Sequence, residues 1–430
     1  MNVCVFGLWH LGSVTSACLA SLGVDVVGLD LDERVIAGLS AGRPPLFEPG
    51  LAELVQKGIE AGRLSFSSDP QRALASADVL WVTYDTPVDD DDRADEAFVV
   101  ERIARLFPHI RSGATVLISS QLRAGSTRKL RERFEREQPG REVGFAYSPE
   151  NLRLGKALEV FLQPDRIVIG TDDARSREQL TRMLGNLAER AEWMSTESAE
   201  VTKHALNAFL ALSISFANEV AGICERVGAD AKEVERGLKS ERRIGPGAYL
   251  GPGAAFAGGT LARDVQYLRA LAAEHDQPSV LLSAIKESND QHRQWVQRRL
   301  KRRFPELRRR KVAVLGLTYK PGTDTLRRSS AVELCRWLFE QGTDVRAHDP
   351  KAQLAAAEEA LGAVRVCDSA AEALHDAEAV VIATPWPEYA QLRAAELPTV
   401  FDPHGVLAKA APGTQVEYHA VGRPDVRRRS

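Results

Sequence analysis

The first residues whose types and spacing point to chemistry form a glycine-bearing turn near the start of the chain. Gly7 to Gly12 reads G-L-W-H-L-G and follows the apolar run Val3–Phe6, and Asp30 ends a second apolar run. This is the frame of a dinucleotide-binding G-x-G-x-x-G turn, in which a helix N-terminus faces the pyrophosphate and an acidic residue binds the ribose. An acid there repels a 2′-phosphate, so the pattern favours NAD over NADP.

Trp9 stands where such a turn normally has its middle glycine. That glycine lets the backbone approach the pyrophosphate without a Cβ. An indole at this position must therefore point aside or occupy part of the phosphate path. A strand-to-helix turn that binds no nucleotide remains the alternative.

A second candidate group lies within a long helical pattern. Lys203 and Asn207 are four residues apart and therefore share a helix face. Oxidation of an alcohol by hydride transfer needs a base or a bound water for the hydroxyl proton and a cation for the developing alkoxide. The pair could supply both, whereas an ordinary surface lysine and helix asparagine would supply neither.

Two loops carry further polar or flexible residues. Gly251–Thr260 is a glycine-rich loop of the kind that wraps closely around a ligand, although a plain connector is the alternative. Ser148–Arg153 follows an apolar strand pattern, which puts its side chains at the carboxyl edge of a sheet, where open α/β folds bind ligands. A structural turn is the alternative for this second loop.

The elements that must position these residues follow an α/β rhythm. Short apolar runs at 24–29, 79–83, 114–119 and 166–170 alternate with helical patterns, which predicts a parallel sheet covered on both faces and an N-terminal NAD-binding domain over residues 1–195. An unbroken helical pattern over 196–227 opens a central helical domain, 196–304. Runs at 311–315, 344–347 and 379–384 predict a second Rossmann-like domain over 305–430. The expected fold class is α/β, with two doubly wound domains joined by a long bridging helix.

Composition limits the partners. The 430 residues are 44% hydrophobic and carry a net charge of −3, so no overall field attracts nucleic acid or an anionic membrane. We expect a small-molecule partner. Five scattered cysteines without a C-x-x-C pair argue against disulfides and a zinc site, and no metal site is expected. With no export signal or membrane span recognised in the sequence, we expect a cytoplasmic protein.

Taken together, the chain resembles the nucleotide-sugar dehydrogenase family, which includes UDP-glucose 6-dehydrogenase and GDP-mannose dehydrogenase. The resemblance runs from end to end. It rests on the GLWHLG start and, in order, on Phe47–Leu51, Asp85–Pro87, Ser119–Gln121, Ser148–Arg153, Lys203 with Asn207, Asn218–Glu219, Arg243–Gly245, Phe256–Asp264 and Gly316–Ser329.

The resemblance implies roles for particular residues. The NAD site would include Gly7, Trp9, Leu11, Gly12, Asp30, Arg34, Thr86, Gln121, Arg263 and Arg327. The nucleotide sugar is expected to be a UDP-sugar. It would be held by Glu150, Leu152, Arg153, Lys203, Asn207, Tyr249, Phe256, Gly258 and Lys320, with Arg243 reaching over from the partner of a homodimer formed through the central helices. The catalytic group would comprise Lys203, Asn207, Glu150, Thr260 and Asp264.

The chain departs from the family pattern at two of these blocks. Family members oxidise a sugar CH2OH to a carboxylate with two NAD, through a cysteine thioester, in a loop written GFGGSCFPKD. Here Thr260 stands at the cysteine position, and Leu154 replaces a glutamate of the PEFLRE block. A threonine hydroxyl without an activating base is a weak nucleophile.

Three functions therefore remain open. The first is a single two-electron oxidation of a nucleotide sugar. The second is a non-catalytic relative that binds nucleotide sugar, and the third is the four-electron oxidation by a route without cysteine. Polysaccharide or specialised glycoside biosynthesis would fit the family.

Overall fold

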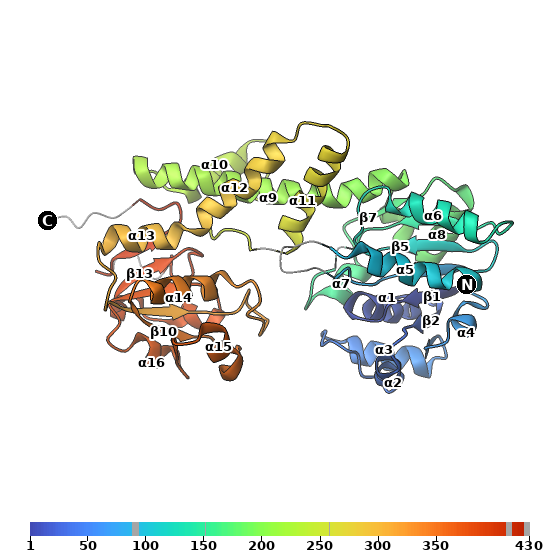
Figure 1. Cartoon of the computed structure of the whole chain (residues 1–430), viewed down its shortest axis with the longest axis horizontal. Helices are drawn as coiled ribbons and strands as arrows, with labels where there is room; N and C mark the ends of the chain where they lie inside the picture. The colour runs from blue at the N-terminus through green and yellow to red at the C-terminus, as the bar shows by residue number, and fades with distance from the viewer. Residues whose placement is uncertain (88–93, 151, 258, 410–414, 425–430) are drawn as a thin grey trace. The chain divides into compact units, whose positions relative to one another are not determined.

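The computed structural model describes residues 1–87, 94–150, 152–257, 259–409 and 415–424. The chain divides into two compact units, Met1–Leu206 and Asn207–Ser430. The boundary falls inside one long helix, α9 (Thr196–Val227). The predicted fold class is confirmed, because two Rossmann-like sheets and this long helix are present (Figure 1).

The first unit is built on an eight-stranded sheet in the order β3-β2-β1-β4-β5-β6-β7-β8. Its strands are β1 (Asn2–Phe6), β2 (Asp25–Leu29), β3 (Leu64–Ser67), β4 (Val79–Val82), β5 (Thr115–Ile118), β6 (Gly144–Tyr147), β7 (Ile167–Gly170) and β8 (Ala191–Met194). This order, reversing between β1 and β4, is that of a doubly wound fold with its ligand crevice at the carboxyl ends of the strands.

The sheet differs from the expected parallel pattern at one place. β7 is antiparallel to β6, which it meets at Tyr147 and Gly170. The connection between them carries only α7 (Ala157–Leu162). A short helix alone does not explain the reversal, because the five-residue α4 (Pro70–Leu74) connects β3 to β4, and these strands run parallel in the same sheet.

Alternating strand residues fill two separate cores. Cys4 and Phe6 face one core and Val3 and Val5 the other, and all four are at most 1% exposed. Burial on both faces explains why the strands read as continuous apolar runs. The helices of this unit are α1 (His10–Ser21), α2 (Glu33–Ser40), α3 (Leu51–Glu60), α4 (Pro70–Leu74), α5 (Glu96–Leu106), α6 (Ser126–Glu137), α7 and α8 (Ala174–Leu184).

Helix α9 has the bounds that the unbroken apolar periodicity predicts. By length and composition it is apolar enough to cross a membrane, with a mean hydropathy of 1.4 over an 18-residue window, 44% of which is buried. Core helices of globular proteins meet the same criterion, so one such helix is weak evidence. The expectation of no membrane partner stays a prediction. Four more helices follow: α10 (Ala231–Ser240), α11 (Thr260–Glu274), α12 (Val280–Arg293) and α13 (Trp295–Arg303).

The second unit also contains a six-stranded parallel sheet in the order β11-β10-β9-β12-β13-β14. Its strands are β9 (Lys311–Leu315), β10 (Asp344–His348), β11 (Arg365–Val366), β12 (Ala379–Ile382), β13 (Thr399–Asp402) and β14 (Tyr418–Ala420), and its helices are α14 (Ser330–Glu340), α15 (Leu354–Leu361) and α16 (Ala370–Leu374). Two buried clusters, one on each face, again account for the apolar strands.

Candidate active site

The glycine-bearing turn joins β1 directly to α1. A Cβ on Gly12 would lie 2.0 Å from the carbonyl oxygen of Gly7, so only glycine lets the helix start this close to the strand. Asp30 follows β2 and is 9% exposed. Its Oδ2 accepts the N–H of Leu8 at 2.8 Å and its Oδ1 that of Asp32 at 3.0 Å. Each carboxylate oxygen keeps a lone pair, enough for two ribose hydroxyls.

Trp9 is the N-cap residue of α1 and makes no side-chain cap. Its side chain is 49% exposed, so the indole points outward rather than into the core, and Leu11 beneath the turn is buried. No side chain caps the first turn of α1, and its amides form the kind of helix terminus that attracts a phosphate. The residues present fit a dinucleotide, and Trp9 stands at the helix terminus where the pyrophosphate would bind.

The carboxyl ends of β4 and β5 bring Thr86 and Gln121 together. The Thr86 hydroxyl donates to the carbonyl oxygen of Gln121 at 2.7 Å. Beside them Ser120 is 1% exposed, and its hydroxyl has no partner among the described residues. Such a buried hydroxyl can be satisfied by a ligand or a water. The exposed guanidinium of Arg34 pairs with Asp32 at 3.0 Å.

Lys203 reaches from α9 to the loop after β6. Its Nζ donates to the carbonyl oxygen of Glu150 at 2.7 Å and lies 3.9 Å from Glu150 Oε1, and the lysine side chain is only 9% exposed. Glu150 Oε2 in turn accepts the N–H of Leu152 at 3.0 Å. The structure therefore brings Lys203, Glu150 and Leu152 together, while Arg153 lies at the surface.

Two residues that the sequence analysis missed hold this part of α9 in place. Glu200 is fully buried and accepts hydrogen bonds from the amides of Gly125 and Thr127 at the start of α6. Burial raises its pKa. His204 Nε2 lies 3.1 Å from the carbonyl oxygen of Leu122. Both residues could have been noticed in the sequence, because they interrupt an apolar helical pattern, and acidic or imidazole side chains are rarely buried without hydrogen-bond partners.

In the second unit, Asn207 and Asp264 form a buried pair. Asn207 Nδ2 donates to Asp264 Oδ2, and the two residues are 6% and 0% exposed. Asp264 lies one turn after Thr260, which is the first residue of α11 and is exposed. Among the described residues, none makes a hydrogen bond with the Thr260 hydroxyl. Within this described part of the chain, the Thr260 hydroxyl therefore has no hydrogen-bonded base.

The glycine-rich loop is held by three polar side chains to which the sequence analysis assigned no role. Asn218 of α9 accepts the N–H of Gly253 at 3.0 Å, and His292 Nε2 lies 2.8 Å from the Gly253 carbonyl oxygen. Asn289 of α12 bonds both the N–H and the carbonyl oxygen of Phe256. A plain connector needs no such framework, so this loop has a defined shape. Single polar residues in helices left no pattern from which to predict these contacts.

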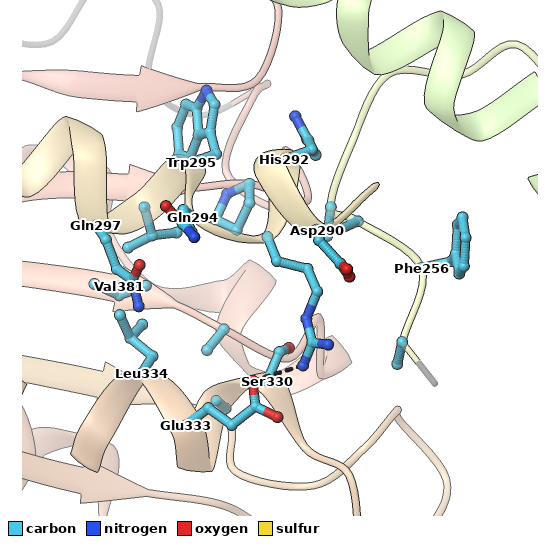
Figure 2. A pocket seen from close by; sticks show the side chains of 18 of the residues that line it. Phe256, Asp290, His292, Gln294, Trp295, Gln297, Ser330, Glu333, Leu334 and Val381 are labelled. Carbon is cyan, nitrogen blue, oxygen red and sulfur yellow. Dashed lines mark hydrogen bonds and ion pairs between the residues drawn. The ribbon is translucent and has the colours of Figure 1, made fainter. Parts of the chain in front are cut away.

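A pocket of about 410 Å³ lies next to this loop (Figure 2). It is lined by Phe256 of the loop, by Ser330 at the start of α14 and by Ala383 directly after β12. Arg293 forms an ion pair with Glu333 across its lining, drawn as a dashed line. Its lining also includes Pro403 and His404 directly after β13, so the pocket reaches the carboxyl edge of the sheet, where open α/β folds bind ligands.

The remaining predicted residues lie at the surface or outside the described residues. Tyr249, Lys320 and Arg327 are exposed, Arg263 of α11 is partly buried, and exposed Arg243 pairs with Glu241 at 3.0 Å. Gly258 lies outside the described residues. Within the part of the chain that the structure describes, no cluster of three metal-ligating side chains occurs.

Comparison with protein families matches nearly the whole chain in three segments. Residues 1–187 match the NAD binding domain of the UDP-glucose/GDP-mannose dehydrogenase family, residues 197–291 its central domain and residues 313–409 its UDP binding domain. The three matches follow one another in the order of the β-sheet, helical and second β-sheet regions.

Individual proteins agree with the family match. A UDP-glucose 6-dehydrogenase of Rhizobium meliloti is 33% identical over 442 residues, covering 99% of this chain and 100% of the relative. The UDP-glucose 6-dehydrogenase AglM of Haloferax volcanii is 36% identical over 405 residues, covering 91% and 93%. The structure of a UDP-glucose dehydrogenase from Pyrobaculum islandicum superposes with a TM-score of 0.86 at 34% identity, covering 98% of each chain.

Proposed function

Because this chain belongs to the UDP-glucose/GDP-mannose dehydrogenase family, we propose that it oxidises an alcohol of a UDP-glucose-like nucleotide sugar in a single two-electron step. The family resemblance, the oxidoreductase class and NAD as cofactor are confirmed by the comparisons. The substrate, the number of hydrides and the roles of single residues belong to the proposal.

The observation that carries the proposal is the buried ammonium group of Lys203. Its hydrogen bond to the Glu150 carbonyl fixes it beside the loop after β6, and Asn207 follows one turn later on the same helix. When bound, NAD accepts the hydride. Lys203 orients a water that takes the hydroxyl proton of the substrate, and its ammonium group stabilises the alkoxide oxygen that forms. Asn207, held by Asp264, donates a hydrogen bond to the same alkoxide oxygen. Asp30 binds the ribose, and the pocket beside Phe256 takes the nucleotide of the sugar.

The chain's nucleophiles support stopping after one hydride. Thr260 has no activating partner among the described residues, and all five cysteines are buried and free. Burial raises the pKa of the Cys18 thiol to about 12 and raises that of Cys4 and Cys335 as well. A buried, protonated thiol is inert. Leu154, at the position of the family's glutamate, is 47% exposed and supplies no base.

A homodimer through the central helices belongs to the same proposal. Phe209, Phe216, Ile223 and Val227 of α9 are between 48% and 71% exposed, and their spacing puts them along one face of the helix. An apolar stripe of this length favours burial against a second copy. We retain the predicted domains 1–195, 196–304 and 305–430, a cytoplasmic location and a role in polysaccharide biosynthesis as further parts of the proposal.

Product analysis tests the number of electrons. With NAD and UDP-glucose, we expect one NADH per product and an aldehyde mass, without an acid. Thr260→Cys should increase the yield towards two NADH per product, because a thiol restores the missing nucleophile. Two NADH and an acid from the unaltered protein would support the four-electron route.

Substitution of Lys203 tests the catalytic group. Lys203→Ala should lower kcat by about a thousandfold, as expected for loss of a charge that stabilises the oxyanion. Lys57→Ala on α3, whose side chain is exposed, is the matched control and should leave the rate unchanged. Equal rates for the two variants would refute the role of Lys203.

Trp9 favours one second candidate, a non-catalytic protein that binds nucleotide sugar. Trp9 carries a Cβ and a half-exposed indole at the N-terminus of α1, where the pyrophosphate of a dinucleotide would bind. Calorimetric titration with NAD, NADP and UDP-glucose separates the two functions. UDP-glucose binding without dinucleotide binding would support the non-catalytic candidate.

A further inference from the structure

Glu48 is a buried carboxylate that the proposed function does not use. It lies in the segment before α3, and its side chain is 1% exposed. Three donors surround it: His10 Nε2 at 3.0 Å from Oε2, the N–H of Gly155 at 2.9 Å from Oε2, and the N–H of Ala157 at 2.8 Å from Oε1. These contacts join parts of the chain that are 38 to 109 residues apart.

The donors belong to the two loops that the proposed function assigns to cofactor and sugar. His10 is the first residue of α1, inside the glycine-bearing turn. Gly155 and Ala157 end the loop that begins with Glu150, and Ala157 starts α7, whose N-cap Lys156 makes no side-chain cap. Glu48 thus replaces the missing cap of α7 from a distant segment.

The sugar loop is consequently fixed at both ends. Lys203 Nζ holds the carbonyl oxygen of Glu150 at the start, and Glu48 holds Gly155 and Ala157 at the end. Among the described residues, the one ion pair of Glu48 is with His10. Removing His10 would leave a buried carboxylate whose charge only two amides stabilise, and a group in that position moves or takes up water.

We propose that His10 is a positioning residue for the sugar loop: through Glu48 it fixes residues 152–157 and so joins the dinucleotide turn to the nucleotide-sugar site. The inference rests on the proposed function for the identity of the two ligands. The arrangement of Glu48 itself does not depend on which reaction takes place.

The test compares His10→Ala with His10→Gln, whose side-chain amide can still donate to Glu48. We expect His10→Ala to weaken UDP-glucose binding about tenfold, the equivalent of one hydrogen bond to a charged group, while the Kd for NAD changes less than twofold. His10→Gln should restore most of the loss. Calorimetry on the full chain measures both ligands.

The matched control is His419→Ala in the other unit, which also removes a histidine from a contact with a glutamate, Glu417 at 3.3 Å. It should leave UDP-glucose binding unchanged. Equal weakening of NAD and UDP-glucose by His10→Ala, or a similar loss in His419→Ala, would overturn the proposal in favour of a general effect on stability.

Hydrogen exchange provides a measurement that needs no ligand. The amides of Gly155 and Ala157 should exchange faster in His10→Ala than in the unaltered protein, and slowly again in His10→Gln. Unchanged exchange would overturn the proposal. If the unaltered protein does not bind UDP-glucose, the proposed substrate fails, and exchange still decides whether His10 fixes the loop.

Discussion

In each Rossmann-like sheet an aspartate follows the second strand, Asp30 after β2 and Asp349 after β10, and binds the backbone of the first turn. Asp30 Oδ2 accepts the N–H of Leu8 at 2.8 Å, and Asp349 Oδ2 accepts that of Leu317 at 2.7 Å. The two carboxylates share this hydrogen bond but differ in the number of further hydrogen bonds that they accept.

The acceptor positions of the Asp349 carboxylate are filled by hydrogen-bond donors of the protein itself. Its further donors are the N–H and hydroxyl of Thr318, the indole of Trp386, and the amides of Lys351 and Ala352. Asp30 accepts one further amide, that of Asp32. A carboxylate has about four acceptor positions, so Asp30 keeps room for a ligand and Asp349 does not. The same topology therefore leaves acceptor positions open on the aspartate of the first sheet and makes the aspartate of the second an internal brace.

The turns after β1 and β9 also differ, in the number of residues between the end of the strand and the start of the next helix. Helix α1 starts three residues after Gly7, whereas α14 starts only at Ser330, well beyond Gly316. A helix N-terminus close to the strand offers amides to a pyrophosphate. The longer connection after β9 instead carries Tyr319, Lys320 and Arg327, which are exposed.

The largest expected effect is a loss of stability, and it tests the close backbone packing that both turns share. Gly12→Ala would place a Cβ 2.0 Å from the Gly7 oxygen, and Gly316→Ala would place one 2.4 Å from Thr384 Cβ at a φ of +94°. Each should cost more than about 4 kcal/mol in the free energy of unfolding, measured by urea denaturation. Gly222→Ala, at an open helical position, is the control and should cost nothing. A stable Gly12→Ala protein would contradict the close packing.

The next effect distinguishes the two aspartates by stability. Asp349→Ala strands several buried donors and should cost about 4 kcal/mol, against about 1 kcal/mol for Asp30→Ala. Urea denaturation of both variants measures the difference. Equal costs would remove the distinction between brace and cofactor contact.

Acid sensitivity follows from the same bonds. The backbone amides of Leu317, Thr318, Lys351 and Ala352 hold the pKa of Asp349 below its usual value. A lowered pKa contributes stability that is present above the unfolded value of 3.8 and is lost as the pH falls through the folded value. The stability difference between the unaltered protein and Asp349→Asn should therefore shrink below about pH 3.8, as measured by denaturation between pH 2 and 6.

The third effect concerns cofactor affinity. Asp30→Ala should weaken NAD binding about thirtyfold, or about 2 kcal/mol, since it removes the acceptor of the ribose hydroxyls. Asp349→Asn should leave the Kd for NAD unchanged. Titration calorimetry decides, and a weakened Kd in both variants would argue against separate functions.

The smallest effect concerns Trp9. Trp9→Gly should tighten NAD binding about threefold, because it removes a Cβ from the phosphate path while the indole, half exposed, contributes little to the core. Fluorescence titration against Trp9→Ala, expected to be intermediate, measures this. Weaker binding in Trp9→Gly would show that the indole contacts the cofactor.

Periodicity predicted most of the fold. The bounds of α9 follow from an apolar helical pattern without a proline, and the strands of both sheets follow from apolar runs. The reversal of β7 could not be predicted, because an apolar run indicates a strand but not the direction in which that strand pairs with its neighbour.

The candidate site was predictable in part. Asp30 and Lys203 could be predicted as candidate site residues from their positions in the sequence. Asp30 ends a strand pattern and Lys203 shares a helix face with Asn207, and these positions determine the directions of their side chains. The contact between Lys203 and Glu150, and the pair of His10 with Glu48, join residues 53 and 38 positions apart. Such contacts depend on the packing of whole elements, for which one sequence carries no periodic signal.

The continuity of α9 fixes the spacing of two candidate site residues. The boundary between the two units lies between Leu206 and Asn207, inside a hydrogen-bonded helix rather than in a loop. Lys203 and Asn207 are therefore about 6 Å apart along one axis, the rise of four helical residues. The spacing of these two side chains, which the proposed function assigns to one oxygen, is therefore set by the geometry of a helix and not by a loop.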